Sequence, residues 1–221
     1  MTEHQLEVLA DAEAAARRAA ELIAARAAEE IERKGSFSLA ASGGKEPWEM
    51  YRMLGEMEID WDRVEVFQVD ERVAPDGDDA RNLTHLLESL PEAARKRIRP
   101  MPVSDEDLDG AAARYTEVLP DRIDLVHLGI GPDGHTASLV PNDPVLDVTD
   151  RRVAVSNEYQ GHRRLTLTYP ELERAGALLW LITGESKRDP LGWLLANEHA
   201  IPAGRVEAEE SIVIADKAAA G

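Results

Sequence analysis

Residues 123–138 read IDLVHLGIGPDGHTAS, an apolar run that passes directly into a glycine-rich loop. The run Ile123–Leu128 has the length and composition of a buried β-strand. Glycines at 129, 131 and 134 allow the backbone to turn tightly and to approach a ligand closely. Ligands of open α/β sheets bind beyond the carboxyl ends of the strands, so the loop 129–138 is predicted to belong to a functional site.

Short apolar runs alternate with helical stretches on both sides of this segment. Strands are predicted at 36–41, 64–69, 152–156, 164–168, 177–183 and 211–215, and helices at 47–57, 80–90, 107–119 and 187–197. A long amphipathic helix is predicted from His4 to Lys34, ended by Gly35. This alternation indicates an α/β fold, with a mostly parallel β-sheet and helices on both faces.

Length and composition predict one domain. The chain has 221 residues, 43% of them apolar, which is enough for one sizeable core. We therefore expect a single domain over residues 1–221, with an N-terminal helix, 1–34, packed on it. The chain has no Cys, which excludes a disulfide framework, a thiolate nucleophile and a Cys-ligated metal.

The chain carries a formal net charge of −18, from 43 acidic and 25 basic residues. Such a charge repels phosphodiester backbones, so nucleic acid is not an expected partner. It also repels anionic metabolites, so a site for one must concentrate the few basic side chains. No apolar run approaches the roughly 18 residues of a membrane span and no signal peptide is recognisable, so we expect no membrane partner and a cytoplasmic location.

His135 is the candidate general base. A neutral imidazole, with an ordinary pKa of about 6.5, can accept a proton near pH 7. Asp133, two residues earlier, is a candidate for orienting the imidazole or a water molecule. The alternative is that His135 only satisfies a loop carbonyl. His127 lies inside the apolar strand and is predicted to be a packed histidine rather than a catalyst.

A second glycine loop, 42–47, follows the strand 36–41. Ser42, Gly43, Gly44 and Lys45 precede Pro47 at the first turn of a predicted helix. Free amides at a helix N-terminus favour an anion such as phosphate, and Lys45 adds positive charge. An ordinary strand-to-helix turn is the alternative interpretation of this loop.

Charged residues follow or open three further strands. Asp70, Glu71 and Arg72 come directly after 64–69, Arg164 opens 164–168, and Lys187 follows 177–183. An arginine can bind phosphate or a carboxylate through its planar fork. These basic residues fit the requirement set by the net charge, although solvated surface charges are the alternative for each.

Several common catalytic motifs are missing from the sequence. It has no GxSxG elbow, HExxH motif or P-loop, so neither a protein nucleophile nor a bound metal is indicated. Residues 129–134 formally match GxGxxG, but Pro132 and Asp133 stand where a helix should begin to receive a pyrophosphate. The simplest hypothesis is therefore a reaction in which water is the nucleophile and no cofactor takes part.

These motifs, in this order, resemble those of the 6-phosphogluconolactonase family. The resemblance runs from about Ser36 to Lys187 and is most specific at Gly129–Ser138, followed by Pro141. Further support comes from Asp70-Glu71-Arg72, Arg81-Asn82, Arg164-Leu165-Thr166-Leu167 and Gly184–Lys187. The family belongs to a wider Rossmann-like fold group that includes glucosamine-6-phosphate deaminase and ribose-5-phosphate isomerase.

The resemblance implies hydrolysis of 6-phospho-D-glucono-1,5-lactone to 6-phospho-D-gluconate in the oxidative pentose phosphate pathway, without metal or cofactor. His135 would take a proton from the attacking water, with Asp133 beside it. The implied substrate- and phosphate-binding residues are Ser42, Gly43, Gly44, Lys45, Asp70, Arg72, Arg164 and Lys187. The expected partner is a small phosphorylated sugar lactone, and the sequence is compatible with a monomer.

Two alternatives stay open beside the lactonase. One is an amino-sugar phosphate deaminase or isomerase, although such deaminases typically continue the Asp-Gly-His core into Phe-Asn-Glu, where this chain has Ala137-Ser138-Leu139. The other is a sugar-phosphate-binding domain without catalysis. The chain departs from the lactonase pattern at Lys45-Glu46, where Ser or Thr is common, and at Val140, where Phe is common.

Overall fold

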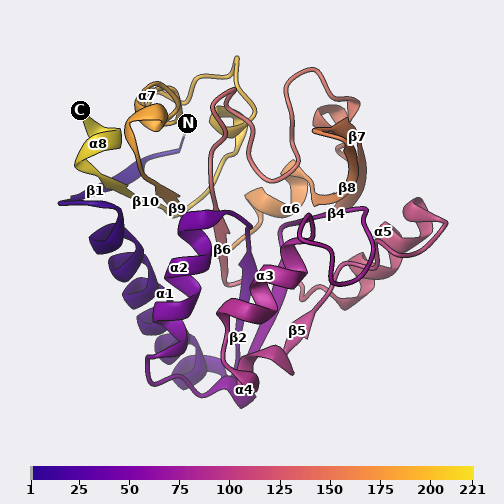
Figure 1. Ribbon diagram of the computed structural model, residues 1–221, viewed down its shortest axis with the longest axis horizontal. Helices are drawn as coiled ribbons and strands as arrows, with labels where there is room; N and C mark the ends of the chain where they lie inside the picture. The colour runs from indigo at the N-terminus through magenta and orange to yellow at the C-terminus, as the bar shows by residue number, and fades with distance from the viewer. Residues whose placement is uncertain (1) are drawn as a thin grey trace.

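A computed structural model describes residues 2–221, and Met1, the first residue of the expected single domain, lies outside them. Within the described residues the main sheet has seven strands in the order β1-β10-β9-β6-β2-β3-β5, all paired in parallel. Their bounds are β1 His4–Leu9, β2 Phe37–Ala41, β3 Val64–Gln68, β5 Ile98–Arg99, β6 Leu125–Leu128, β9 Ala177–Ile182 and β10 Ser211–Asp216. The predicted α/β fold with a mostly parallel sheet is confirmed (Figure 1).

Helices cover both faces of this sheet. They are α1 Ala12–Lys34, α2 Lys45–Gly55, α3 Asn82–Ser89, α4 Glu92–Arg95, α5 Leu108–Val118, α6 Tyr169–Glu173, α7 Arg188–Leu195 and α8 Lys217–Ala220. The apolar core has two parts, because successive strand residues point to opposite faces. Leu125 belongs to the part formed with α1 and α2, and Val126 to the part formed with α5 and α7. Among residues 2–221, none of the helices has the length and apolarity needed to cross a bilayer.

A second, antiparallel sheet has the order β4-β8-β7, with β4 Asp70–Arg72, β7 Val153–Tyr159 and β8 His162–Leu167. The predicted strands 152–156 and 164–168 therefore pair in a hairpin outside the parallel sheet. The reason is their connection through Gln160 and Gly161, which have φ of 53° and 82°. Positive φ at both residues is typical of a type I′ hairpin turn, whereas parallel strands need a crossover of a dozen residues or more.

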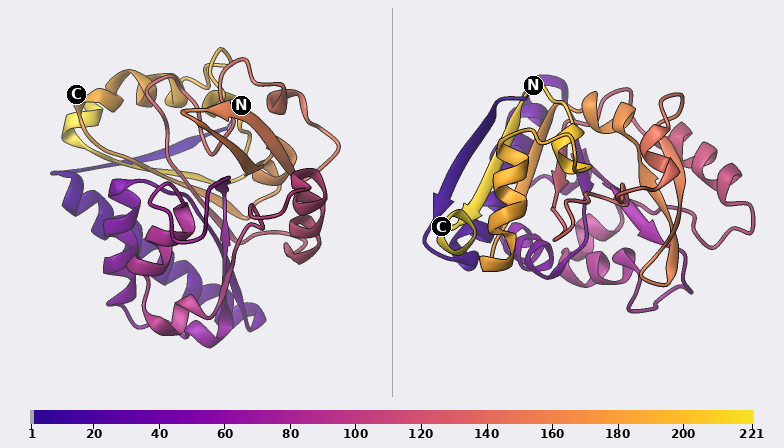
Figure 2. Two further views of the ribbon diagram at one scale, coloured as in Figure 1. Left: turned by 45° about the vertical axis from the view of Figure 1, so that its right-hand side comes forward. Right: turned by 90° about the horizontal axis from the view of Figure 1, so that it is seen from above.

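The prediction of one helix over residues 1–34 was wrong at its beginning. Residues His4–Leu9 form β1, an edge strand paired in parallel with β10, and the helix begins only at Ala12. Figure 2 shows β1, in indigo, beside β10, in yellow, at the edge of the sheet. Asp11 sets the boundary because its carboxylate accepts a hydrogen bond from the Ala14 amide at 2.9 Å. Composition does not reveal this boundary, since Glu and Leu occur on both sides of it.

Parallel pairing brings the carboxyl ends of β2, β3, β6 and β9 to one edge of the sheet. The loops that follow β2 and β6, and the turn after β9, therefore converge there. β4 follows β3 after the single residue Val69 and carries the chain into the small sheet. The two sheets together form the walls of the candidate site.

His127 in β6 is fully buried, as expected for a packed histidine. Its Nδ1 lies 3.0 Å from the Tyr51 hydroxyl. Burial lowers the pKa of His127 to about 3, so the ring is neutral in the folded protein at all but strongly acidic pH. In the unfolded chain the same ring takes up a proton near its ordinary pKa of about 6.5.

Acidification from pH 7 to pH 5 is therefore expected to lower the free energy of unfolding by about 2 kcal/mol through His127. The reason is that His127 gains a proton in the unfolded state and not in the folded state. Denaturant unfolding of wild type and His127→Leu at both pH values measures this. Other titrating groups are common to the two proteins, so the comparison isolates His127. Between pH 7 and pH 5, the free energy of unfolding should fall more steeply for wild type than for His127→Leu. Equal pH dependence in both would contradict the assignment.

Candidate active site

A cavity of about 230 Å³ lies at the carboxyl edge of the parallel sheet, against β4 and β8. This is below the roughly 300–1,000 Å³ of sites for drug-sized ligands, so it fits a small metabolite. Eight of the ten predicted site residues line it, namely Ser42, Gly43, Gly44, Asp70, Arg72, His135, Arg164 and Lys187. The other two do not: Lys45 is an exposed first residue of α2, with Glu46 lining the cavity beside it, and Asp133 lies behind His135.

The loop after β6 folds back on itself to present His135. The Gly131 amide donates to the His135 carbonyl at 2.8 Å, and Gly134 has a φ of 80°. A Cβ added to Gly131 would lie 2.1 Å from the imidazole, so only glycine leaves room for the ring there. Thr136 anchors the loop by donating its hydroxyl to the Gly129 carbonyl at 2.9 Å. The glycines therefore allow the loop to place His135 at the cavity.

Asp133 and His135 form a pair. The Nδ1 of His135 lies 2.5 Å from Oδ1 of Asp133. Burial raises the pKa of Asp133, but the hydrogen bond and the charge of His135 outweigh it and leave the pKa below its usual value. An ionised carboxylate only accepts hydrogen bonds, so the imidazole proton sits on Nδ1 and Nε2 is left as the basic nitrogen. The imidazole side chain is 21% exposed, which leaves it accessible to a ligand.

Asp70 has both carboxylate oxygens occupied by neighbouring side chains. Its Oδ2 accepts from the Ser138 hydroxyl at 2.6 Å, and its Oδ1 from the Asn82 amide at 3.2 Å. Asn82 also donates to the Asp70 carbonyl at 3.0 Å. This buried carboxylate joins the loop after β6 to the start of α3. It lines the cavity but is already strongly engaged within the protein.

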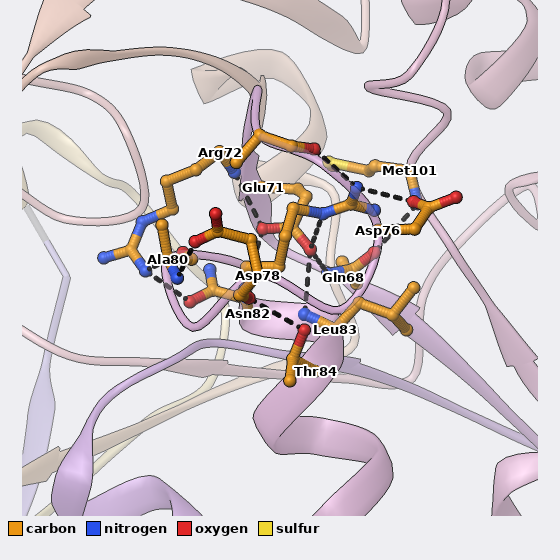
Figure 3. A network of polar contacts seen from close by, with 12 residues as sticks. Gln68, Glu71, Arg72, Asp76, Asp78, Ala80, Asn82, Leu83, Thr84 and Met101 are labelled. Carbon is orange, nitrogen blue, oxygen red and sulfur yellow. Dashed lines mark hydrogen bonds and ion pairs between the residues drawn. The ribbon is translucent and has the colours of Figure 1, made fainter.

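Glu71 is the centre of a buried polar network (Figure 3). Its carboxylate accepts from Gln68 Nε2 and from the Asn82 and Leu83 amides, each at 2.8 Å. Arg81, 3% exposed, lies 3.2 Å from the same carboxylate. Figure 3 shows Arg72 extending away from Glu71 toward Ala80 and Asn82, and its Nη1 donates to both. Sequence reasoning singled out Asp70-Glu71-Arg72, but Glu71 faces the protein interior and Arg72 the cavity.

Two arginines stand side by side on the cavity wall. Arg72 of β4 and Arg164 of β8 are direct cross-strand partners, so both point to the same face. Burial lowers the pKa of Arg164, and the positive charge of Arg72 adds to this, whereas the charge of Asp70 opposes it. Within residues 2–221, the Nε atoms of both arginines are buried without a hydrogen-bond partner. The pair therefore has donor capacity left for an anionic ligand.

The loop after β2 borders the cavity opposite β8. Gly44 has a φ of 136° and precedes α2, with no side chain capping the helix. A Cβ on Gly43 would lie 2.1 Å from Asn82 Oδ1, so this position requires glycine. Lys187 donates to the Ile130 carbonyl at 2.7 Å, and burial lowers the pKa of its ammonium group. Free helix amides and this lysine are groups that bind phosphate.

Sequence reasoning did not assign site roles to Asn82, Ser138 or Tyr159. Asn82 lines the cavity, and Ser138 binds Asp70. Tyr159 contacts both Asp133 and Arg164. Asn82 and Ser138 lie within motifs that carry the family resemblance, which was the available signal. Tyr159 has no such signal, because a hairpin brings it to the site.

Comparisons with known proteins identify the family of this chain. The family model described as glucosamine-6-phosphate isomerases/6-phosphogluconolactonase matches residues 10–214. A 6-phosphogluconolactonase of Nostoc sp. is 32% identical over 98% of this chain and 96% of its own length. The crystal structure of a 6-phosphogluconolactonase from Thermotoga maritima superposes with a TM-score of 0.87 and 26% identity, covering 97% of this chain and 100% of that one.

The fold alone does not identify the reaction. A monomeric glucosamine-6-phosphate deaminase superposes with a TM-score of 0.84 at 19% identity, covering 98% of both chains. At that identity the likeness concerns the fold only. The choice of reaction therefore depends on sequence relatives and on the side chains of the site.

Proposed function

Because the chain belongs to the glucosamine-6-phosphate isomerase/6-phosphogluconolactonase family, we propose that it hydrolyses 6-phospho-D-glucono-1,5-lactone with water activated by His135. The product is 6-phospho-D-gluconate, and the reaction is a step of the oxidative pentose phosphate pathway. The lactonase assignment rests on relatives of that name, such as the protein of Nostoc sp.. The observation that carries the mechanism is the Asp133–His135 pair beside a cavity lined by Arg72, Arg164 and Lys187.

In the proposed mechanism, Nε2 of His135 takes a proton from a water molecule as the water oxygen attacks the lactone carbonyl. The carbonyl π electrons move onto its oxygen, giving a tetrahedral oxyanion. When this intermediate collapses, the bond from the carbonyl carbon to the ring oxygen breaks and the ring oxygen receives a proton from the imidazolium. Asp133 holds the ring by Nδ1 and stabilises its charged form. The net change is the addition of one water molecule, and no covalent enzyme intermediate forms.

We assign substrate binding to the basic groups around the cavity. Arg164 and Lys187, with the amides of Gly43 and Gly44 before α2, are proposed to hold the phosphate. Arg72 is a candidate donor to the developing oxyanion, a role that contributes about 10²- to 10³-fold in comparable sites. Ser42 is a weaker candidate, because its hydroxyl already donates to the His127 carbonyl at 2.8 Å. Lys45 has no place in this proposal, since it does not line the cavity.

A substrate panel tests the reaction class. Purified wild type is given freshly generated 6-phosphogluconolactone, glucosamine 6-phosphate and an aldose phosphate, and lactone loss, ammonia release and ketose formation are recorded. The proposal predicts lactone hydrolysis above the spontaneous rate and neither of the other products. Ammonia release without lactone hydrolysis would establish the deaminase alternative. Binding of 6-phosphogluconate with no turnover of any substrate would favour a binding domain.

We also propose that the enzyme works as a monomer in the cytoplasm. A charged phosphate ester does not cross a bilayer unaided, so its consumption belongs in the compartment that produces it. Every residue with a role in the proposed mechanism can be supplied by one chain, so the mechanism itself requires no second copy. Light scattering should report the mass of a single chain, and cell fractionation should recover the lactonase activity with the cytoplasm. A larger mass or a membrane-bound activity would refute the corresponding part.

A further inference from the structure

Tyr159 lies at the end of β7, beside the type I′ turn that joins β7 to β8. Ser156 pairs with Arg164, but Tyr159 pairs with His162, so β7 advances three residues while β8 goes back two. This one-residue bulge changes which β7 side chain faces the cavity. An unbroken register would put Glu158 opposite His162. With the bulge Tyr159 takes that place, on the same face as Arg164, because cross-strand partners share a face.

The side chain of Tyr159 contacts three residues of the proposed site. Its hydroxyl donates to Asp133 Oδ2 at 3.2 Å. Its ring meets the His135 imidazole nearly edge-on, with 5.4 Å between centroids and 66° between planes. The guanidinium carbon of Arg164 lies 5.1 Å from the ring centroid, and Arg164 Nη2 donates to the Tyr159 carbonyl at 3.2 Å. The half-buried side chain of Tyr159 thus connects the Asp133–His135 pair to Arg164, the candidate phosphate-binding residue.

We infer that Tyr159 is a positioning residue that fixes the Asp133–His135 pair through its hydroxyl and Arg164 through its ring. The inference rests on the proposed function, in which His135 is the base and Arg164 binds the phosphate. The Asp133 side chain is 36% exposed. It accepts hydrogen bonds from the amide and the imidazole of His135, and a further one from the Tyr159 hydroxyl. Without it, the carboxylate and the imidazole it holds can rotate together away from the reacting water.

The chemistry of the phenol fits this role. Burial raises the pKa of Tyr159, and the negative charge of Asp133 raises it further, so the hydroxyl keeps its proton as a donor. A cation over an aromatic face is attracted by the ring quadrupole, which favours the observed position of Arg164. Glu158 in the same place would instead bring a second carboxylate toward Asp133. The bulge therefore places the neutral hydroxyl of Tyr159 at a position where the carboxylate of Glu158 would disrupt the Asp133–His135 pair.

Tyr159→Phe separates the two contacts, because it removes the hydroxyl and keeps the ring. We expect kcat for 6-phosphogluconolactone to fall about 3- to 10-fold, the loss typical of one hydrogen bond, with KM unchanged. The acidic limb of the pH profile of kcat/KM should move to higher pH, since Asp133 loses a donor and holds the imidazolium more strongly. In Tyr159→Ala, which also removes the ring beneath Arg164, KM should rise as well.

Tyr169→Phe is the matched control. The Tyr169 hydroxyl donates to the Pro202 carbonyl at 3.0 Å, away from the cavity, so this variant should lose stability and keep kcat. Thermal unfolding of all variants reports folding. A Tyr159→Phe enzyme with wild-type kcat and pH profile would overturn the inference while leaving the lactonase intact. An inactive wild type would refute the proposed function, and the inference with it.

Discussion

Replacing His135 by alanine is expected to lower kcat for lactone hydrolysis by about 10²- to 10⁴-fold, the contribution typical of a well-placed general base. The reason is geometric: Nδ1 is engaged by Asp133 at 2.5 Å, so Nε2 is the basic nitrogen that remains for a water molecule. KM should change little, because the imidazole acts in the transition state and the phosphate is held elsewhere. Steady-state rates, corrected for spontaneous ring opening, measure the loss.

Two further variants make this result specific. His199 is exposed and outside the cavity lining, so His199→Ala should keep wild-type kcat. Asp133→Asn should have intermediate activity, because it leaves the imidazole in place and removes the charge that stabilises its protonated form. If His135→Ala kept wild-type kcat and had the thermal unfolding transition of wild type, the general base would have to be another residue.

Arg164→Ala is expected to raise KM for the lactone by about 10- to 100-fold, with a smaller change in kcat. Hydrogen bonds to charged groups contribute about 1.5–3 kcal/mol, and each 1.4 kcal/mol corresponds to a factor of ten. A group that binds the phosphate does so equally in the ground state and the transition state, which places its effect in KM. The effect should be large because Arg164 is only 3% exposed and its Nε has no partner within the described residues.

Arg163 offers a control one residue away. It precedes Arg164 in β8, is exposed, and does not line the cavity. Arg163→Ala removes the same net charge from the protein and should leave KM near its wild-type value. Equal KM increases in both variants would mean that overall charge, and not contact with the phosphate, determines substrate binding. Unchanged kinetics in Arg164→Ala would remove this residue from the site.

The sequence predicted the parallel sheet and the location of the site because both depend on local patterns. Ile123–Leu128 is apolar except at Asp124 and His127, as is typical of a strand covered on both faces, and β6 occupies its last four residues. The loops after β2 and β6 could be chosen from the topology rule for open sheets alone. For this reason the sequence predicted that His135 and Gly43 lie at one edge of the sheet.

The features that could not be predicted from the sequence depend on pairing between distant segments of the chain. β1 is an edge strand whose pairing partner, β10, lies about 200 residues later in the chain. Asp70–Arg72 was predicted only to follow the strand 64–69, but it forms β4 because β8 lies beside it. Tyr159 reaches the site through a bulge, and a one-residue change of register cannot be inferred from an isolated hairpin sequence.

One time course of freshly generated 6-phosphogluconolactone with wild type and with His135→Ala, without added metal, tests the lactonase reaction and the role of His135 together. Product is followed by coupled oxidation of 6-phosphogluconate, and spontaneous opening is subtracted. We expect rapid hydrolysis by wild type and a rate close to the spontaneous one for the variant. Equal acceleration by both proteins would contradict the role of His135, and no acceleration by wild type would contradict the lactonase itself.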